Sequence, residues 1–435
     1  MKSLLIQFKM FFIFVMDLAV AFGALFLMIF LRYGGGNWDI RLSAHLIPFS
    51  IIILLFVLIF YIFNLYSFRF NKNITEFTNS FTKSLIISFS LSVLIFYIFG
   101  DFFKLTPKTN LILFTGIFGV SDFYLRILIK RYFTKKRVGR KIIIVSAKDD
   151  ALVEELRQNQ NIGYEIIRES GDLDLNEVIA LRPDAVVINS MEEKEFKKIY
   201  TIIKKGIFVY TVNNFYEEIF QKVPTEKIEK DEIVDYLSKN KTIFNFTKRI
   251  LDIVLASILI LLLLPVLALT SILIKITSSG PVLFKHKRIS QNDTEFIIYK
   301  FRSMYTDAEK NGAVWTKSNK EDPRITPFGR LMRETHLDEI PQLLNILKGD
   351  ISFVGPRPER PEFVSELKKD ILYYDLRHSV KAGLTGWAQV NYRYGASVDD
   401  AREKLKYDFY YIKNRNIFFD ILIILKTVAM IFLRH

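Results

Sequence analysis

The chain has 435 residues, a formal net charge of +14 and a composition that is 50% hydrophobic, with 40 phenylalanines. It is long enough for two or three domains and too apolar on average for an ordinary soluble protein. In a soluble protein this charge would indicate nucleic acid, but beside apolar runs of membrane length it indicates anionic headgroups or phosphorylated substrates. The absence of cysteine excludes disulfides, thiolate catalysis and cysteine-ligated zinc.

Four apolar runs fill the first third of the chain, at residues 10–31, 46–66, 84–103 and 111–129. Each approaches the ~20 residues that a helix needs to cross the hydrocarbon core of a membrane. Asp17 and Asp122 lie within two of these runs. Buried carboxylates in spans can mark ion pathways, but we expect these two to be structural and to face another helix.

The stretch "KRYFTKKRVGRK", residues 130–141, follows the fourth run and contains no acidic residue. A solvated charge run would explain it, but the positive-inside rule favours a cytoplasmic anchor beside the membrane. Because Lys2 and Lys9 make the start of the chain basic as well, four spans place both ends of this region in the cytoplasm. We therefore expect a transmembrane domain of four helices over residues 1–130.

A small parallel α/β domain of the Rossmann-like type is expected over residues 138–220. The segments "KIIIV", "DAVVI" and "IFVYTV" are short apolar strand candidates, and charged helical patterns such as "DDALVEELRQ" alternate with them. A dinucleotide site would need a glycine-rich turn after the first strand. That turn reads "SAKDD". We therefore favour a degenerate structural or regulatory domain, with dinucleotide binding as the alternative.

A fifth apolar segment, residues 246–277, follows a charged linker at residues 221–245. It is long enough to span a membrane, but Pro265 inside it removes a helical hydrogen bond and predicts a kink or a break. A full crossing would place the rest of the chain, with its dense polar motifs, outside the cell. We therefore expect a re-entrant helix that enters one leaflet and returns, and we keep a kinked span as the alternative.

Polar motifs follow one another in the last third of the chain: "GPVLFKHKRI", "YKFRSMYTDAE", "DPRITPFGRLMR", "HLDEIPQLLNILKGDISFVGPRPE" and "KAGLTGWAQVNYRYG". With the entry residues Lys248, Arg249 and Asp252, this part resembles the bacterial sugar transferase family. These are polyprenyl-phosphate hexose-1-phosphate transferases of the monotopic type. The resemblance is dense over residues 245–435, and the front end looks like that of the large members. It implies a mostly helical catalytic domain over residues 278–435.

The adjacent carboxylates Asp338 and Glu339 suit the transfer of a sugar phosphate. A carboxylate can attack phosphorus and form an acyl phosphate, which splits one displacement into two. Cations must then cancel the repulsion between the anions. Pro341 predicts a first helical turn here, where a helix dipole would favour anions. The resemblance implies that Asp338 is the nucleophile and that Glu339 is the ligand of Mg²⁺. His336 could be a general base, but an ionised carboxylate needs none.

Other polar residues of these motifs are candidates for substrate binding. Arg357 lies between Pro356 and Pro358, so its guanidinium fork is held in a stiff turn and suits phosphate. Further candidates are Lys300, Arg302 and Arg324, each of which could equally be a structural ion-pair partner. The segment with Trp387, Gln389 and Tyr392 could bind a nucleotide or be a packed turn. The last apolar stretch, with Asp420 and Lys426, predicts an interfacial or core-packed helix.

The resemblance implies transfer of hexose 1-phosphate from a UDP-sugar to undecaprenyl phosphate, with a covalent aspartyl intermediate and release of UMP. The product would start an exopolysaccharide, capsule or O-antigen repeat. The enzyme would be a multi-pass protein of the bacterial inner membrane, with its catalytic domain on the cytoplasmic face, no nucleic-acid partner and a homodimer left open. A transporter or a membrane scaffold would explain the spans, but neither needs Asp338 beside Glu339 and Arg357.

Overall fold

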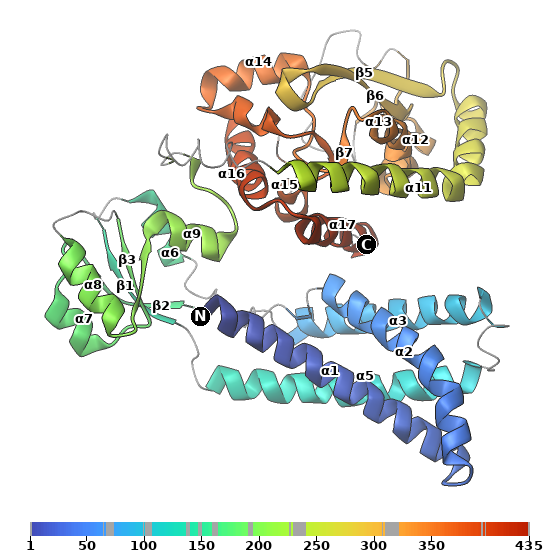
Figure 1. Ribbon diagram of the computed structural model, residues 1–435. Coiled ribbons are helices and arrows are strands. Elements are labelled where there is room, and N and C mark those ends of the chain that lie inside the picture. Colours follow the sequence, from blue (N-terminus) through green and yellow to red (C-terminus); the bar gives the residue numbers. More distant parts are fainter. Residues whose placement is uncertain are drawn as a thin grey trace. The chain divides into compact units, whose positions relative to one another are not determined.

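The computed structural model describes residues 2–63, 65–66, 74–98, 100, 107–135, 140–146, 150–158, 164–189, 195–225, 228, 241–306, 308, 322–392, 395 and 397–433. The contacts divide the chain into two compact units, Met1–Thr211 and Val212–His435. The first unit contains apolar helices and a parallel sheet, and the second is mostly helical with short strands (Figure 1). The expected fold class, α plus α/β with a membrane region, is confirmed.

Long apolar helices begin the first unit, as the four runs predict: α1 (Lys2–Tyr33), α2 (Trp38–Ile62), α3 (Ile74–Ile98) and α5 (Pro107–Lys135). By length and composition, each contains a segment that could cross a membrane. The predicted basic anchor begins inside α5, and its residues 136–139 lie outside the described residues. These helices fit a membrane protein.

Charged side chains are buried between α1 and α5. Arg126 donates to Asp122, one turn earlier on its own helix, at 2.7 Å, and it also contacts Asp17 on α1. A third guanidinium nitrogen donates to the carbonyl oxygen of Leu65 at 2.8 Å. Asp17 therefore faces another helix, as expected, and the arginine is the partner that compensates both carboxylates.

The α/β part of the first unit is a parallel sheet with strand order β2-β1-β3-β4. The predicted strands correspond to β1 (Arg140–Val145), β3 (Ala185–Ile188) and β4 (Phe208–Thr211), and the helices are α6 (Ala151–Gln158), α7 (Leu175–Leu181) and α8 (Phe196–Lys204). The strand β2 (Tyr164–Ser170), at one edge, was not predicted. Its sequence, YEIIRES, mixes charges with apolar residues because this edge strand is only partly buried.

The second unit begins with α9 (Val212–Phe220), which the sequence places in the α/β domain, and α11 (Thr242–Thr277). A hairpin follows, made of β5 (Leu283–Ile289), the turn η4 (Gln291–Asp293) and β6 (Glu295–Phe301). The remaining elements are α12 (Pro327–Glu334), η5 (Leu337–Gln342), α13 (Leu343–Lys348), β7 (Ser352–Val354), α14 (Pro361–Asp370), η6 (Tyr374–Ser379), β8 (Gly383–Thr385), α15 (Trp387–Asn391), α16 (Val398–Asn414) and α17 (Ile417–Leu433).

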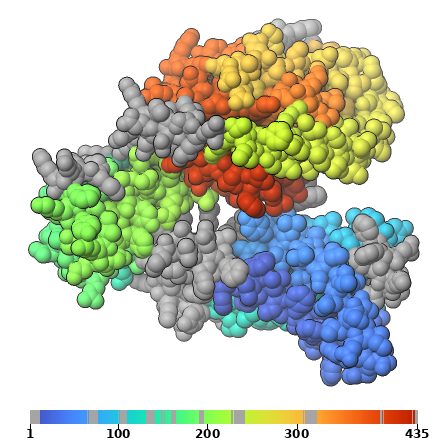
Figure 2. Space-filling model, viewed as in Figure 1, coloured from blue at the N-terminus to red at the C-terminus, as the bar shows by residue number. Residues whose placement is uncertain are grey.

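The helix α11 is 36 residues long, or about 54 Å at 1.5 Å per residue, and it continues through Pro265. Figure 1 shows that it changes direction and ends in a second arm, coloured yellow, before β5. The proline therefore kinks the helix and does not end it. Apolar side chains such as Leu261, Leu262 and Leu264 are exposed along it. This surface forms a yellow-green to yellow band along the second unit in Figure 2, and it suits contact with lipid.

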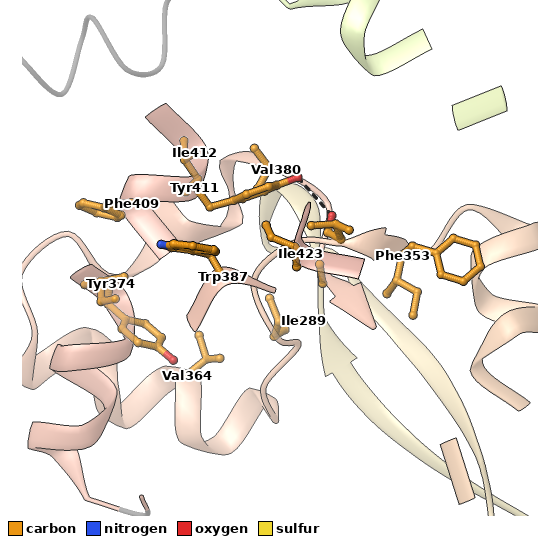
Figure 3. Packing of buried hydrophobic residues seen from close by; sticks show 14 of the residues in the cluster. Ile289, Phe353, Val364, Tyr374, Val380, Trp387, Phe409, Tyr411, Ile412 and Ile423 are labelled. Atoms are coloured by element: carbon orange, nitrogen blue, oxygen red, sulfur yellow. Dashed lines mark hydrogen bonds between the residues drawn. The ribbon is translucent and has the colours of Figure 1, made fainter. Parts of the chain in front are cut away.

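The core of the second unit gathers side chains from the central and last elements. Trp387, 2% exposed, packs with Tyr410 and Phe419, and Ile423 of α17 is fully buried. Figure 3 shows Trp387, Tyr411 and Ile423 within this cluster. One face of α17 is therefore packed into the core, as predicted for a helix too short to span.

The segment from α9 to residue 225 completes this core. The carbonyl oxygen of Gln221 accepts a hydrogen bond from the indole of Trp387 at 2.9 Å, and the buried Val223 belongs to the same hydrophobic cluster. Lys413 on α16 forms an ion pair with Glu217 of α9 at 2.7 Å. The start of the predicted linker thus packs within the second unit.

A chain shortened to begin at Lys241 should be less stable than one that begins at Val212. The longer chain keeps α9, Val223 and the hydrogen bond between Gln221 and Trp387, whereas the shorter one exposes the apolar surface that they cover. We expect the midpoint of thermal unfolding to be at least about 4 °C lower, since 1 kcal/mol corresponds to roughly 2–4 °C at this size. Equal midpoints for the two purified proteins in detergent would contradict this.

Candidate active site

The acidic pair lies in the first turn of a helical run. His336 has a left-handed backbone conformation (φ 58°) and precedes η5, a 3-10 helix that contains Asp338, Glu339 and Pro341 and continues directly into α13. The helical turn expected at Pro341 therefore starts four residues earlier, at Leu337, and is tighter than an α-helix. Asp338 is 7% exposed, so its carboxylate is largely withdrawn from solvent.

The strand β6 brings Lys300 to this pair. Asn345 on α13 binds the two backbone groups of β6 that flank Ile298: its side-chain oxygen accepts from Tyr299 N at 3.0 Å, and its nitrogen donates to Ile297 O at 2.7 Å. The amide thereby replaces a neighbouring strand along this part of β6. Because η5 and α13 are consecutive, this fixes Lys300 relative to Glu339.

A single carboxylate oxygen of Glu339 accepts hydrogen bonds from two cationic side chains, Lys300 and Arg357. Lys300 Nζ lies 2.6 Å from Glu339 Oε1, and Arg357 Nη2 lies 2.9 Å from the same atom. Arg357 comes from the Pro-Arg-Pro turn that follows β7, far from β6 in the sequence. The structure therefore brings together four of the predicted residues, namely Asp338, Glu339, Lys300 and Arg357.

The environment separates the pKa values of the two carboxyls. Burial favours the neutral form of Glu339, but the charges of Lys300 and Arg357 outweigh burial and hold its pKa well below the usual range. Burial raises the pKa of Asp338, the charge of Glu339 raises it further, and Lys300, Arg333 and His336 offset only part of this. Glu339 therefore stays ionised, whereas the predicted ionisation of Asp338 depends on cations around it more than on a helix dipole.

Further cations surround the pair. Arg333 on α12 donates to Ser303 Oγ at 2.8 Å and lies close enough to Asp338 to favour its ionised form. Burial lowers the pKa of Arg288 on β5 to about 10. Arg288 is also close enough to Glu339 and Arg357 for their charges to shift its pKa. Such a cluster can attract and hold a multiply charged anion. Neither arginine was predicted, although "KRI" and "LMR" stand inside the quoted motifs.

Two predicted binding residues have protein partners. The guanidinium of Arg302 donates to Ser278 O and Oγ, at 2.9 and 2.7 Å, where α11 ends. Arg324 forms a two-pronged pair with Asp322, with distances of 2.9 and 2.6 Å. Both contacts suit the structural role that the sequence left open, and substrate contact by either residue stays a prediction.

The glycine-rich segment "KAGLTG" packs against the Pro-Arg-Pro turn. A Cβ atom on Gly383 would lie 2.1 Å from Gly355 N, and one on Gly386 would lie 2.2 Å from Gly355 O. Gln389 donates to Leu384 O at 3.1 Å, and its side-chain oxygen is buried without a partner among the described residues. Trp387 lies in the core, so the packed-turn interpretation holds for it. A substrate role for Gln389 stays a prediction.

The entry residues of the membrane helix attach it to the candidate site. Arg249 donates to Ile346 O and Leu347 O at the end of α13, and Asp252 accepts from Phe353 N at 3.2 Å. Lys248 pairs with Asp420 on α17. Beyond Pro265, Ile274 forms a hydrophobic cluster with Phe301 and Met332, and Leu337, the residue before Asp338, packs against this cluster. The first arm of α11 therefore contacts α13, which follows the acidic pair, and the second arm contributes to the cluster that packs with the residue before it.

Few protein ligands are available for a metal. The described part of the chain contains no group of three or more His, Asp or Glu side chains that could hold an ion. One oxygen of Glu339 already accepts from Lys300 and Arg357. Mg²⁺ fits such a site, because it commonly binds through one or two carboxylates together with water and the phosphates of a substrate.

Comparison with known proteins supports the resemblance. The model of the family described as "Bacterial sugar transferase" matches residues 243–434. The chain is 38% identical over 263 residues to the UDP-N-acetylgalactosamine-undecaprenyl-phosphate N-acetylgalactosaminephosphotransferase of Aeromonas hydrophila, which covers 60% of this chain and 61% of the relative. It is 40% identical over 191 residues to the exopolysaccharide production protein PSS of Rhizobium leguminosarum, covering 42% of this chain and 93% of the relative.

A third relative is the UDP-glucose:undecaprenyl-phosphate glucose-1-phosphate transferase of Escherichia coli, 39% identical over 183 residues, or 42% of this chain and 39% of the relative. The chain thus spans less than two thirds of the lengths of the Aeromonas and Escherichia relatives.

Replacing Asn345 by Ala should destabilise the second unit by about 2–3 kcal/mol, because this fully buried side chain is the partner of Tyr299 N, Ile297 O and the Asp350 carboxylate. The matched control is Asn391→Ala, which removes one hydrogen bond, to Trp387 O, from an exposed side chain. Thermal unfolding of the purified variants measures both effects. Equal shifts for the two variants would show that Asn345 does not hold β6.

Proposed function

Because the chain belongs to the bacterial sugar transferase family, we propose that it transfers hexose 1-phosphate from a UDP-sugar to undecaprenyl phosphate and releases UMP. The observation that carries this proposal is the buried Asp338 beside Glu339, whose Oε1 is held by Lys300 and Arg357. The names of the relatives agree with such a reaction. The product would start the assembly of a surface polysaccharide.

In the first step, an oxygen of the Asp338 carboxylate attacks the phosphorus that carries the sugar. A bond forms between this oxygen and phosphorus, and the bond from phosphorus to the oxygen that bridges it to UMP breaks, so that UMP leaves with that electron pair. The enzyme then holds the sugar phosphate as an acyl phosphate on Asp338. An ionised carboxylate is a sufficient nucleophile, and no proton has to be removed.

In the second step, a phosphate oxygen of undecaprenyl phosphate attacks the same phosphorus. The bond to Asp338 breaks, the carboxylate is restored, and the product is a sugar linked to the lipid through a diphosphate. Two successive displacements at one phosphorus need the donor and then the acceptor at one site, and they do not need both at once.

The neighbouring cations lower the repulsion in both steps. A carboxylate and a diphosphate carry like charges, so attack requires positive charge at the oxygens of phosphorus. Lys300 and Arg357 are held on Glu339 in advance, so their charges already lie at the site and can act on phosphate oxygens without large reorganisation. The ionised Glu339 keeps both cations in place while the substrate enters.

We further propose that Glu339 binds Mg²⁺ through the oxygen that its two cations leave available. When bound, the ion supplies charge neutralisation at the diphosphate. Lys300 and Arg357 then shift part of their contacts from Glu339 to the substrate.

The catalytic residues are proposed to face the cytoplasm from the inner membrane, where a UDP-sugar is available. The helix α11 is exposed and apolar, and its two arms contact α13 and the β6–α12 region of the same compact unit. This supports a re-entrant helix, because a straight crossing of ~30 Å of hydrocarbon would separate its two ends.

The purified protein should release about one equivalent of UMP per chain from its UDP-sugar before any lipid acceptor is added. The reason is that the first displacement needs only Asp338 and the donor. Rapid mixing with a panel of labelled UDP-sugars, followed by quantification of UMP, measures this. Asp338→Asn preserves size and should abolish the release, whereas Glu339→Gln should weaken it and respond to added Mg²⁺. A first UMP that requires acceptor would instead indicate a ternary complex.

Single cysteines can test the topology of α11, because the chain has none of its own. Thr242 and Ser279 are exposed and lie at the two ends of the helix, so we choose the variants Thr242→Cys and Ser279→Cys. On intact spheroplasts, an impermeant thiol reagent should label neither variant and should label both after the cytoplasmic side is opened. Gly35→Cys, between α1 and α2, is the control and should label from outside. Outside labelling at Ser279 alone would establish a full crossing.

A further inference from the structure

The carbonyl oxygens of the three residues in the Pro-Arg-Pro turn each accept a hydrogen bond from another part of the second unit. Gly383 N donates to Pro356 O at 2.9 Å, Arg377 Nη2 to Arg357 O at 3.1 Å, and Arg288 Nη1 to Pro358 O at 3.1 Å. The two prolines have no N–H with which to anchor the turn. Its position therefore depends on these donors, and two of them are side chains of arginine.

Arg377 is the more firmly placed of the two arginines. It is 6% exposed and lies on η6, and its Nη1 donates to the Tyr374 hydroxyl at 2.5 Å. Its Nη2, which holds Arg357 O, also lies 2.9 Å from Asp408 Oδ2 on α16, as an ion pair without the alignment of a hydrogen bond. A buried guanidinium with a counter-ion and several acceptors is a rigid support.

We propose that Arg377 is a positioning residue for Arg357. It fixes the main chain of Arg357 so that the guanidinium meets Glu339 at 2.9 Å and is directed toward the phosphates of the donor. The proposal rests on the proposed function in taking Arg357 as a phosphate ligand. Among the described residues, Arg377 makes polar contacts with Tyr374, Asp408 and the carbonyl of Arg357, so its influence on the site passes through Arg357.

The placement matters because the side chain of Arg357 is long and is 37% exposed. With a fixed main chain, its guanidinium is held at the site before the substrate arrives, and little reorganisation is needed during the reaction. Without the contact to Arg377, the turn would keep the donors at Pro356 and Pro358 only. A displacement of about 1 Å in a binding group can cost up to about a hundredfold in rate.

The test is a double-mutant cycle on the full-length protein, with Arg357→Ala, Arg377→Lys and the double variant. Lysine keeps the charge beside Asp408, but its single ammonium cannot reproduce the planar fork that spans Tyr374 and Arg357 O. We expect Arg377→Lys to weaken UDP binding, measured by calorimetry, and to lower kcat/KM for the donor, by about ten- to a hundredfold. When Arg357 is already alanine, adding Arg377→Lys should change UDP affinity and kcat/KM by less than about twofold each.

Two further variants serve as a matched control and as a second probe of the Arg377 contacts. Arg402→Lys, on α16 with the exposed partner Asp399, is the matched control and should leave binding unchanged. Tyr374→Phe removes one acceptor of Arg377 and keeps the ring, so it should cause a smaller loss that also disappears when Arg357 is alanine. It is the second probe if Arg377→Lys folds poorly in thermal unfolding.

The outcomes are distinct. The positioning role is overturned if Arg377→Lys binds UDP and turns over as the wild type does, or if its effect multiplies with that of Arg357→Ala. Release of UMP by the wild type tests the proposed function alone. A cycle that is non-additive for UDP binding, in a protein that releases no UMP from any UDP-sugar, would support the positioning role and overturn the function.

Discussion

The arrangement of the second unit depends on one carboxylate oxygen. Glu339 Oε1 accepts one hydrogen bond from Lys300 of the β5–β6 hairpin and one from Arg357 of the turn after β7. Three separate parts of the chain therefore meet at a single atom. Glu339 is partly buried, and these two cations hold its pKa well below the usual range, so that both contacts are charge-assisted hydrogen bonds. Removing either cation would leave the partly buried charge of Glu339 less compensated. This explains why the surrounding elements hold both cations by their main chains as well.

Those supports share one design, in which an interior polar side chain binds backbone groups of the neighbouring segment. Asn345 binds β6 beside Lys300, and Arg249 binds the last carbonyls of α13. Arg377 and Arg288 hold the turn of Arg357 in the same way. Because backbone atoms are insensitive to the identity of the residue that bears them, such contacts fix position and not chemistry. In the proposed mechanism, the chemistry is left to Asp338, Glu339, Lys300 and Arg357.

Much of the fold follows from the local pattern of the sequence, and the site follows only in part. The apolar helices and three of the four strands in the α/β sheet were predictable because each contains a continuous run of mostly apolar residues. The charged edge strand β2 was not, since strand pairing and not composition decides its structure. Likewise, Asp338 and Arg357 are visible in short motifs, whereas nothing in the local sequence of Arg377 indicates the carbonyl of Arg357, which only the tertiary fold brings to it. The pairing of Arg302 with the end of α11 is of the same kind.

The membrane helix and the candidate site constrain each other. Arg249 and Asp252 bind α13 and β7 from the first arm of α11, and Ile274 of the second arm belongs to the cluster against which Leu337 packs, so the bend at Pro265 lets one helix contact elements on both sides of the acidic pair in the sequence. A straight helix of about 54 Å could not return to the same segment. The apolar side chains that remain exposed on α11 would lie in lipid, so the depth of the helix would set the height of Asp338 above the hydrocarbon. For a reaction between a water-soluble donor and a phosphate at the headgroup level, that height is as important as the distance between catalytic side chains.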